Sequence, residues 1–91
     1  MLFIGHYRIH PGNRDAVIAR FAQTEGKPPQ GVKLLGRWHI VSNGSGVTLT
    51  EADDASAMAR FALQWSDLMD LDVTPVLTDE QLGTVLASIK S

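Results

Sequence analysis

The chain has 91 residues and no cysteine, 44% of its residues are hydrophobic, and its formal net charge is −2. We therefore expect a single domain over residues 1–91, with no disulfide scaffold, thiol nucleophile, iron–sulfur cluster or cysteine-based zinc site. The longest apolar run, Met1 to Ile4, is far shorter than the roughly 20 residues of a membrane span and lacks the basic stretch of a signal peptide, so we expect a cytoplasmic protein with no membrane partner.

Alternating and helical patterns of apolar residues predict seven elements along the chain. We expect strands over residues 1–10, 32–41, 47–51 and 71–77, and helices over 14–25, from 53 or 54 to 69, and from 78 onward. Pro75 favours an edge position for the last strand, because proline has no backbone N–H to donate to a neighbour.

Turn and cap residues mark the element ends. Asn13 can cap the first helix, and either Asp53 or Asp54 can cap the second. Thr78 and Gln81 have the spacing of a capping box at the start of the third helix. The segment 42–46 contains Asn43-Gly44, which is typical of a hairpin turn and not of a phosphate-binding loop, because no helix follows it.

The order strand, helix, strand, strand, helix, strand predicts a ferredoxin-like α+β sandwich, with two helices on one face of a four-stranded sheet and a further C-terminal helix. The strand order across such a sheet is fourth, first, third, second. This order mixes the basic residues of positions 1–45 with the acidic residues of positions 46–91.

The hairpin register decides which side chains share a face of the sheet. The preferred register pairs Ile40 with Leu49 and Trp38 with Glu51. It gives one apolar face for the helices and one mixed face. The mixed face is expected to carry Leu2, Ile4, Leu35, Val41 and Val76 beside His6, Arg8, Arg37, His39, Thr48, Thr50, Asp72 and Thr74. A register shifted by one residue, pairing Arg37 with Glu51, stays open.

The aliphatic residues of the mixed face need a cover, because large apolar patches are uncommon on monomers. A second copy packed sheet to sheet about a two-fold axis would provide it. We therefore expect a homodimeric α/β barrel in which His6, Arg37 and His39 lie near a cavity between the sheets.

Seven stretches distributed over nearly the whole chain resemble a known bacterial family. They are Met1-Leu2-Phe3, Pro11-Gly12-Asn13-Arg14-Asp15, Arg20-Phe21, Pro28-Pro29-Gln30-Gly31-Val32-Lys33, Gly36-Arg37-Trp38-His39, Trp65-Ser66-Asp67-Leu68 and Val73-Thr74-Pro75-Val76. The family that they resemble is domain of unknown function 3303. The resemblance implies a dimeric ferredoxin-like α/β barrel but no established reaction, cofactor or catalytic residue.

Histidine is the side chain best suited to proton transfer near neutral pH, so His39 and His6 are candidate catalytic bases. They could meet across the sheet or across the dimer axis, with Arg37 or Arg8 binding an anionic substrate. The alternative is a polar dimer seam that also includes Asp72 and has no catalytic role.

Five further residues are candidates. Glu51 would lie beside Trp38 near the helices as a poised acid, or be a solvated strand end. Tyr7, Trp38 and Trp65 could line a small-molecule pocket, or only pack in the core. Thr50, opposite His39 in the preferred register, is a candidate for substrate binding.

The scattered histidines indicate no metal site and no cofactor. No nucleic-acid partner is expected, since the basic residues occur singly and the third strand, Val47 to Glu51, has no aromatic residue for base stacking. Three functions stay open: a homodimer that binds a small anionic or aromatic metabolite between the sheets or under the helices, a non-enzymatic structural or regulatory dimer, and a cofactor-independent oxygenase or isomerase.

Overall fold

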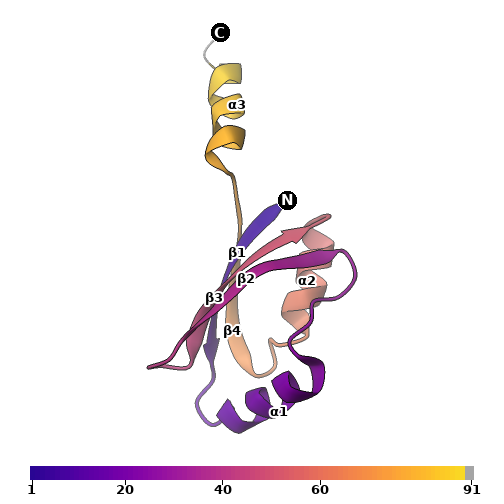
Figure 1. Cartoon of the computed structure of the whole chain (residues 1–91), viewed down its shortest axis with the longest axis vertical. Helices are drawn as coiled ribbons and strands as arrows, with labels where there is room; N and C mark the ends of the chain where they lie inside the picture. Colours follow the sequence, from indigo (N-terminus) through magenta and orange to yellow (C-terminus); the bar gives the residue numbers. More distant parts are fainter. Residues whose placement is uncertain (90–91) are drawn as a thin grey trace.

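The computed structural model describes residues 1–89 and contains the seven elements in the order that the sequence predicts. They are β1 (Leu2–Ile9), α1 (Arg14–Thr24), β2 (Val32–Ile40), β3 (Ser45–Ala52), α2 (Ala55–Leu63), β4 (Met69–Val76) and α3 (Asp79–Ile89). The strands form one antiparallel sheet in the order β2-β3-β1-β4 (Figure 1). The predicted ferredoxin-like α+β fold and its strand order are confirmed, and β4, which contains Pro75, lies at an edge.

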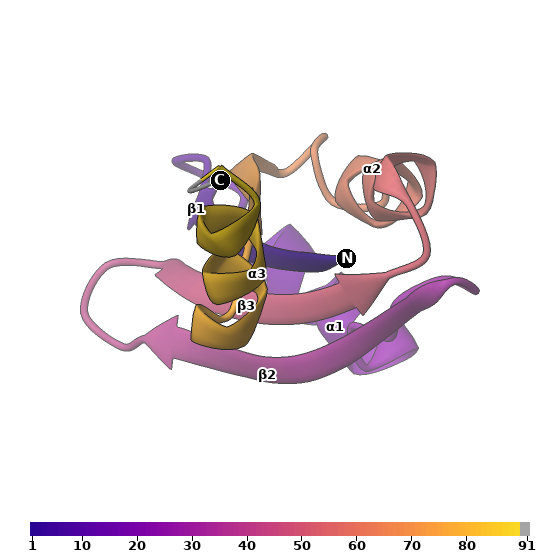
Figure 2. The ribbon, with the colours of Figure 1, turned by 90° about the horizontal axis from the view of Figure 1, so that it is seen from above.

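The helices differ in how they relate to the sheet. Side chains of helices α1 and α2 lie opposite one face of the sheet, where they line a common cavity with strand residues. Figure 2 shows α2 on one side of the twisted strands. Helix α3 continues beyond the end of β4, away from the other elements (Figure 1). Two of the three helices therefore shape the interior of the domain. None of the helices described is both long and apolar enough to cross a membrane.

Two of the predicted caps form capping hydrogen bonds, and one does not. The Asp54 carboxylate accepts a hydrogen bond from the Ala57 backbone N–H at 2.8 Å, which identifies Asp54 as the cap of α2. Thr78 and Gln81 form the reciprocal capping box of α3. Asn13 occupies the N-cap position of α1 as predicted, but its side chain makes no capping hydrogen bond and instead donates to the Leu68 carbonyl at 3.2 Å.

Helix α2 is shorter than predicted. It ends at Leu63, and its expected last turns, including Trp65, belong to a turn segment that leads to Met69 at the start of β4. Met58 and Phe61 of the helical part are buried, so the apolar side of α2 faces inward.

The hairpin register is the main correction to the sequence interpretation. Ile40 pairs with Ser45 and Trp38 with Val47, so neither the preferred register nor the one shifted by one residue is formed. The loop spans residues 41–44, with Gly44 at φ +65°. A β-bulge between Leu34 and Gly36 then reverses the facing of the β2 side chains.

The pairing of β3 with β1 changes the composition of both faces of the sheet, because Tyr7 pairs with Gly46 and His6 with Val47. Arg37, His39, Thr48 and Thr50 share the helix-covered face with Phe3, Gly5 and Tyr7, which lie across from them on β1. We call the opposite side the open face. Its residues, from the strand pairings, are Leu2, Ile4, His6, Arg8, Lys33, Gly36, Trp38, Ile40, Ser45, Val47, Leu49, Glu51, Asp70, Asp72, Thr74 and Val76.

The hydrophobic core lies under α2. Its buried members are Phe3, Ala52, Ala57, Met58 and Phe61. By contrast, α1 has no buried residue. The helix-covered face is therefore packed at the end beneath α2 and hollow where α1 approaches it.

Candidate functional site

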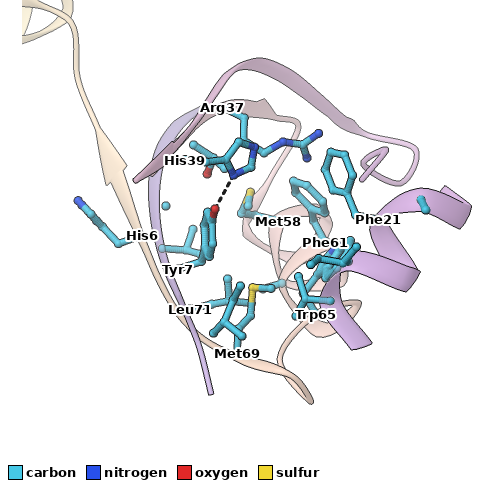
Figure 3. Close-up of a pocket in the computed structure, with 18 residues that line it drawn as sticks. His6, Tyr7, Phe21, Arg37, His39, Met58, Phe61, Trp65, Met69 and Leu71 are labelled. Atoms are coloured by element: carbon cyan, nitrogen blue, oxygen red, sulfur yellow. Dashed lines mark hydrogen bonds between the residues drawn. The ribbon is translucent and has the colours of Figure 1, made fainter. Parts of the chain in front are cut away.

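A cavity of about 430 Å³ lies between the helix-covered face of the sheet and helices α1 and α2 (Figure 3). We call it the helix-side cavity. Its walls consist of Gly5, His6, Tyr7, Ile9, Val17, Ile18, Phe21, Ala22, Arg37, His39, Thr48, Met58, Phe61, Ala62, Trp65, Met69, Leu71 and Val73. Most of these side chains are apolar, and the polar ones come from the central and outer strands.

Tyr7 and His39 meet at one corner of the cavity, where the Tyr7 hydroxyl is hydrogen-bonded to His39 Nδ1 (Figure 3). They lie on β1 and β2, which are not neighbours, and both pair with Gly46 on the intervening β3. A Cβ atom at position 46 would overlap the Tyr7 ring. The absence of a side chain at Gly46 therefore lets the two polar groups meet across it.

Burial raises the pKa of Tyr7 above its usual value, and the positive charge of Arg37 partly opposes this rise. The Tyr7 phenol therefore keeps its proton at neutral pH. Its hydroxyl and the His39 imidazole form a hydrogen-bonded polar pair in an otherwise mostly apolar wall.

Arg37 joins the sheet to the end of α1. Its guanidinium donates to the Gly26 carbonyl at 2.9 Å and to the Glu25 carbonyl at 3.2 Å, and it lies 4.8 Å from the centre of the Phe21 ring. A cation is favourable at the carbonyl end of a helix. Burial lowers the pKa of Arg37, and the Tyr7 hydroxyl partly opposes the decrease. Arg37 thus has a structural role, and its remaining N–H groups lie beside the cavity.

A second polar contact fixes α1 from the other side of the cavity. Arg20 on α1 forms a bidentate pair with Asp67, with both N···O distances 2.8 Å, and also donates to the Gln64 carbonyl. The Arg20 guanidinium lies 5.6 Å from the centre of the Trp65 ring. Because α1 has no buried residue, these polar contacts and those of Arg37 hold it over the cavity.

The structure brings some of the sequence-predicted site residues together and separates others. Tyr7, Arg37, His39 and Trp65 line the helix-side cavity. His6 contributes to its wall, but its side chain points away from the cavity (Figure 3), and it lies on the open face. The expected meeting of His6 with His39 across the sheet is therefore wrong within one chain.

The remaining candidates lie outside the helix-side cavity. Arg8 lines a polar hollow of about 330 Å³ together with His6 and Asp72. Glu51 lies exposed on the open face opposite Leu2, so its expected place beside Trp38 and the helices is wrong. Trp38 is 59% exposed on the same face. Thr50 is fully buried under α2, where its hydroxyl contacts the sulfur of Met58.

Sequence reasoning missed most of the apolar wall and the reason for the polar corner. Phe21, Met58 and Phe61 belong to the predicted helices, and their helical spacing indicates inward faces but not a cavity wall. Gly46 was assigned to the turn, whereas it is a paired strand residue. Within residues 1–89, no group of three or more potential metal ligands occurs.

Comparisons with known proteins identify a family and a similar fold. The family model of domain of unknown function 3303 matches residues 1–90. The fold is similar to the crystal structure of a protein from Deinococcus radiodurans that is provisionally named an antibiotic biosynthesis monooxygenase. The two share 12% identity at a TM-score of 0.46, over 86% of this chain and 94% of that chain. No curated protein matches the chain. The function therefore has to be inferred from the site.

Proposed function

This chain belongs to the domain of unknown function 3303 family, and we propose that it binds a small apolar or aromatic molecule with one anionic or hydrogen-bonding group in the helix-side cavity. The observation that carries the proposal is an apolar cavity of about 430 Å³ with its polar side chains gathered near Tyr7, Arg37 and His39. This volume lies within the range of sites for small molecules, roughly 300–1,000 Å³.

The walls define the chemistry of the proposed ligand. Phe21, Phe61 and Trp65 present aromatic surface, and Met58 and Met69 add flexible thioether groups that adapt to irregular shapes. A strongly polar molecule would lose its hydration without gaining enough hydrogen bonds there. A flat molecule with one polar end, oriented toward Tyr7 and His39, satisfies both parts of the cavity.

The proposed ligand site can be tested with two dyes of nearly the same shape. 8-Anilinonaphthalene-1-sulfonate is anionic, and N-phenyl-1-naphthylamine is its neutral counterpart. We expect both dyes to bind with increased fluorescence. In Ala62→Phe the new side chain fills the cavity, and we expect affinity to fall by about tenfold or more, equivalent to roughly 1.4 kcal/mol.

The control is Ala59→Phe, which adds the same group on α2 at an exposed position outside the cavity wall. It should leave the affinity for both dyes unchanged. Equal binding by the two variants would show that the dyes occupy another surface and would contradict the proposed site. Stronger binding of the anionic dye, lost in Arg37→Gln, would identify the anionic class of ligand.

The second part of the proposal is a homodimer formed through the open faces, with a small-molecule site in each copy. Trp38 and Ile40 are 59% and 46% exposed there, and Ile4, Val47 and Leu49 extend the apolar surface across the sheet. A surface of this kind is uncommon on a monomer. The observed pairing of β3 with β1 gives this face more apolar residues than the sequence predicts, which supports the proposed dimer.

Sedimentation at micromolar concentration tests the dimer. We expect a mass about twice the monomer's 9.9 kDa for the unmodified protein. Ile40→Lys should give the monomer mass because it places a charge within the apolar surface, whereas Leu63→Lys, at an exposed position of α2, should retain the dimer. A monomer mass for the unmodified protein would contradict the dimer.

A catalytic use of the same cavity is a second candidate, favoured by the Tyr7–His39 pair in an apolar wall. A substrate C–H or O–H proton would pass to Nε2 of the His39 imidazole, in the tautomer whose Nδ1–H donates to the Tyr7 hydroxyl, and would give an imidazolium. This step could begin an isomerisation or a cofactor-independent oxygenation. His6, on the open face, has no part in it.

Binding and catalysis give different results for a molecule that co-purifies with the protein or is found by thermal-shift screening. If His39→Gln keeps its affinity but no longer converts the molecule, the protein is an enzyme with His39 as base. If the unmodified protein returns the molecule unchanged, it is a binding module. Binding that depends on neither Tyr7 nor His39 would leave the alternative of a structural or regulatory dimer.

A further inference from the structure

Helix α3 is well formed, but its apolar side stays exposed among residues 1–89. The capping box at Thr78 and Gln81 starts it, and Leu82, Val85, Leu86 and Ile89 follow one another at helical spacing. These four side chains are between 46% and 72% exposed, and no residue of α3 is buried. Figure 1 shows the helix standing away from the sheet and from α1 and α2.

An 11-residue helix is marginal in water without tertiary packing. Residues 1–89 do not supply this packing, because α3 follows β4 after only Leu77 and Thr78 and leads onward past the end of the sheet (Figure 1). A helix with this apolar stripe therefore requires a surface outside its own chain.

The dimensions of the chain show how much more surface it exposes than a compact monomer of the same mass. Its accessible surface is 6334 Å², whereas a compact monomer of this mass exposes about 5,200 Å². Its radius of gyration is 15.3 Å, against about 12 Å for a compact domain of this length. The excess area of roughly 1,100 Å² is comparable to the 800 Å² or so that each partner buries in a stable interface.

The apolar surface of α3 is continuous with the open face. Val76 ends β4 beside Leu2 on the open face, and Leu77, which is 57% exposed, connects that corner to the α3 stripe. When two open faces pack together, the part of each chain that projects past its own sheet extends alongside the other copy. The surface that α3 requires is thus offered by a second copy of the same chain.

We infer that α3 is an arm that packs its Leu82, Val85, Leu86 and Ile89 stripe against the second copy, so that each copy holds its partner with its C-terminal helix. This inference rests on the proposed homodimer and adds which element secures it. The stripe contains no charged residue, in agreement with an occupant that presents apolar surface.

Two adjacent substitutions in α3 test the arm. Leu86→Asp places a charge within the stripe, whereas Ala87→Asp places the same charge on the other side of the same helix turn. Both substitutions place a negative charge near the C-terminal end of the helix, where the helix dipole disfavours it, so this destabilising effect is the same in the two variants. We expect the dimer dissociation constant, measured by sedimentation equilibrium, to rise about tenfold or more for Leu86→Asp and to stay unchanged for Ala87→Asp.

Photo-cross-linking shows what α3 touches. p-Benzoylphenylalanine is introduced at position 86, or at position 87 as control, and the protein is mixed with an excess of ¹⁵N-labelled unmodified protein. Cross-linked peptides that join a light and a heavy chain are intermolecular. We expect them from position 86, with heavy peptides from the sheet strands, and few from position 87.

The outcomes separate the arm from the dimer. If the unmodified protein has the dimer mass but position 86 gives no light–heavy peptide, or if both aspartate variants dimerise as the unmodified protein does, the arm is overturned and the dimer stands. If the unmodified protein is a monomer, the proposed dimer fails and the arm fails with it.

Discussion

Gly46 controls the polar corner of the helix-side cavity, because it lies between Tyr7 and His39 in one row across three strands. A glycine in a strand usually weakens it, and one that is required marks a close approach by another group. Here that group is the Tyr7 ring, which lies over the glycine. The Tyr7–His39 contact therefore requires a residue without a side chain at position 46.

Gly46→Ala should therefore separate Tyr7 from His39. The added methyl overlaps the Tyr7 ring and the Trp38 carbonyl, and we expect the free energy of unfolding to fall by about 1–3 kcal/mol, as for other overpacked sites. Gly83→Ala is the control, because a Cβ there has nothing within 4 Å and a helical glycine is less favourable than alanine. Denaturant unfolding of the two variants should give shifts of opposite sign; equal shifts would contradict the close packing at Gly46.

The ionisation of Tyr7 reports the environment of the same corner. Tyr7 is the single tyrosine of the chain, so the ultraviolet absorbance of tyrosinate follows it alone. Its pKa is raised by burial, so the folded state retains the proton to higher pH than the unfolded state. Stability is therefore fully present below the unfolded pKa of about 10 and is lost as pH rises through the folded pKa.

Arg37→Gln should raise the pKa of Tyr7 further, because the Arg37 charge opposes the effect of burial. Arg14→Gln removes an exposed cation of α1 that lies outside the cavity wall and should leave the titration unchanged. A lower Tyr7 pKa in Arg37→Gln would mean that opening of the cavity to water outweighs the lost charge, and it would contradict the arrangement described.

At the scale of elements, α1 is a cover held by polar contacts. The Arg20 guanidinium, hydrogen-bonded to Asp67, lowers the pKa of that carboxyl. The contribution of this pair to stability is thus present above the unfolded pKa of aspartate, about 3.9, and is lost as pH falls through the lower folded pKa. Because both side chains are partly exposed, the contact should also weaken with salt.

Asp67→Asn tests this role of α1. We expect the amide hydrogens of α1 to lose protection against exchange at pH 7, relative to the unmodified protein. We also expect this protection to depend less on pH below pH 5 in the variant, because the carboxyl that titrates there is gone. Asp15→Asn removes the acidic partner of Arg14 within α1 itself, a pair that spans no two elements. That control should leave exchange in α1 unchanged, and equal effects of the two substitutions would show that the Arg20–Asp67 pair does not hold the helix.

Elements with local signals were predictable from the sequence. The capping box of α3 and the cap of α2 at Asp54 depend on residues at most three apart, and the strand order followed from the order of elements. The register of the β2–β3 hairpin was not predictable in this way. It depends on the contact of Gly46 with Tyr7 from another strand and on the bulge after Leu34.

For the candidate site, the residue types were predictable from the sequence, but their positions on the sheet were not. Tyr7, Trp65, Arg37 and His39 were recognisable by residue type, and all four line the cavity. Which face of the sheet Arg37 and His39 occupy depends on the pairing of β3 with β1, where Tyr7 and not His6 pairs with Gly46. Sequence patterns do not determine this pairing, and they predict both side chains between the sheets instead of under the helices.

At the scale of the whole molecule, the two faces of the sheet have different proposed roles. The helix-covered face contains the cavity, and the open face offers apolar surface to a second copy. Ligand binding and association then use separate surfaces, and we expect Ile40→Lys to alter the mass of the assembly without abolishing dye binding.

The methionine methyl groups test the ligand site most directly. The chain has three methionines; Met58 and Met69 line the cavity, and Met1 does not. With ¹³C-methyl methionine and added 8-anilinonaphthalene-1-sulfonate, we predict that the signals of Met58 and Met69 shift and show contacts to the dye while that of Met1 stays in place. Bound dye that leaves the Met58 and Met69 signals unmoved would contradict the proposal that the helix-side cavity binds small molecules.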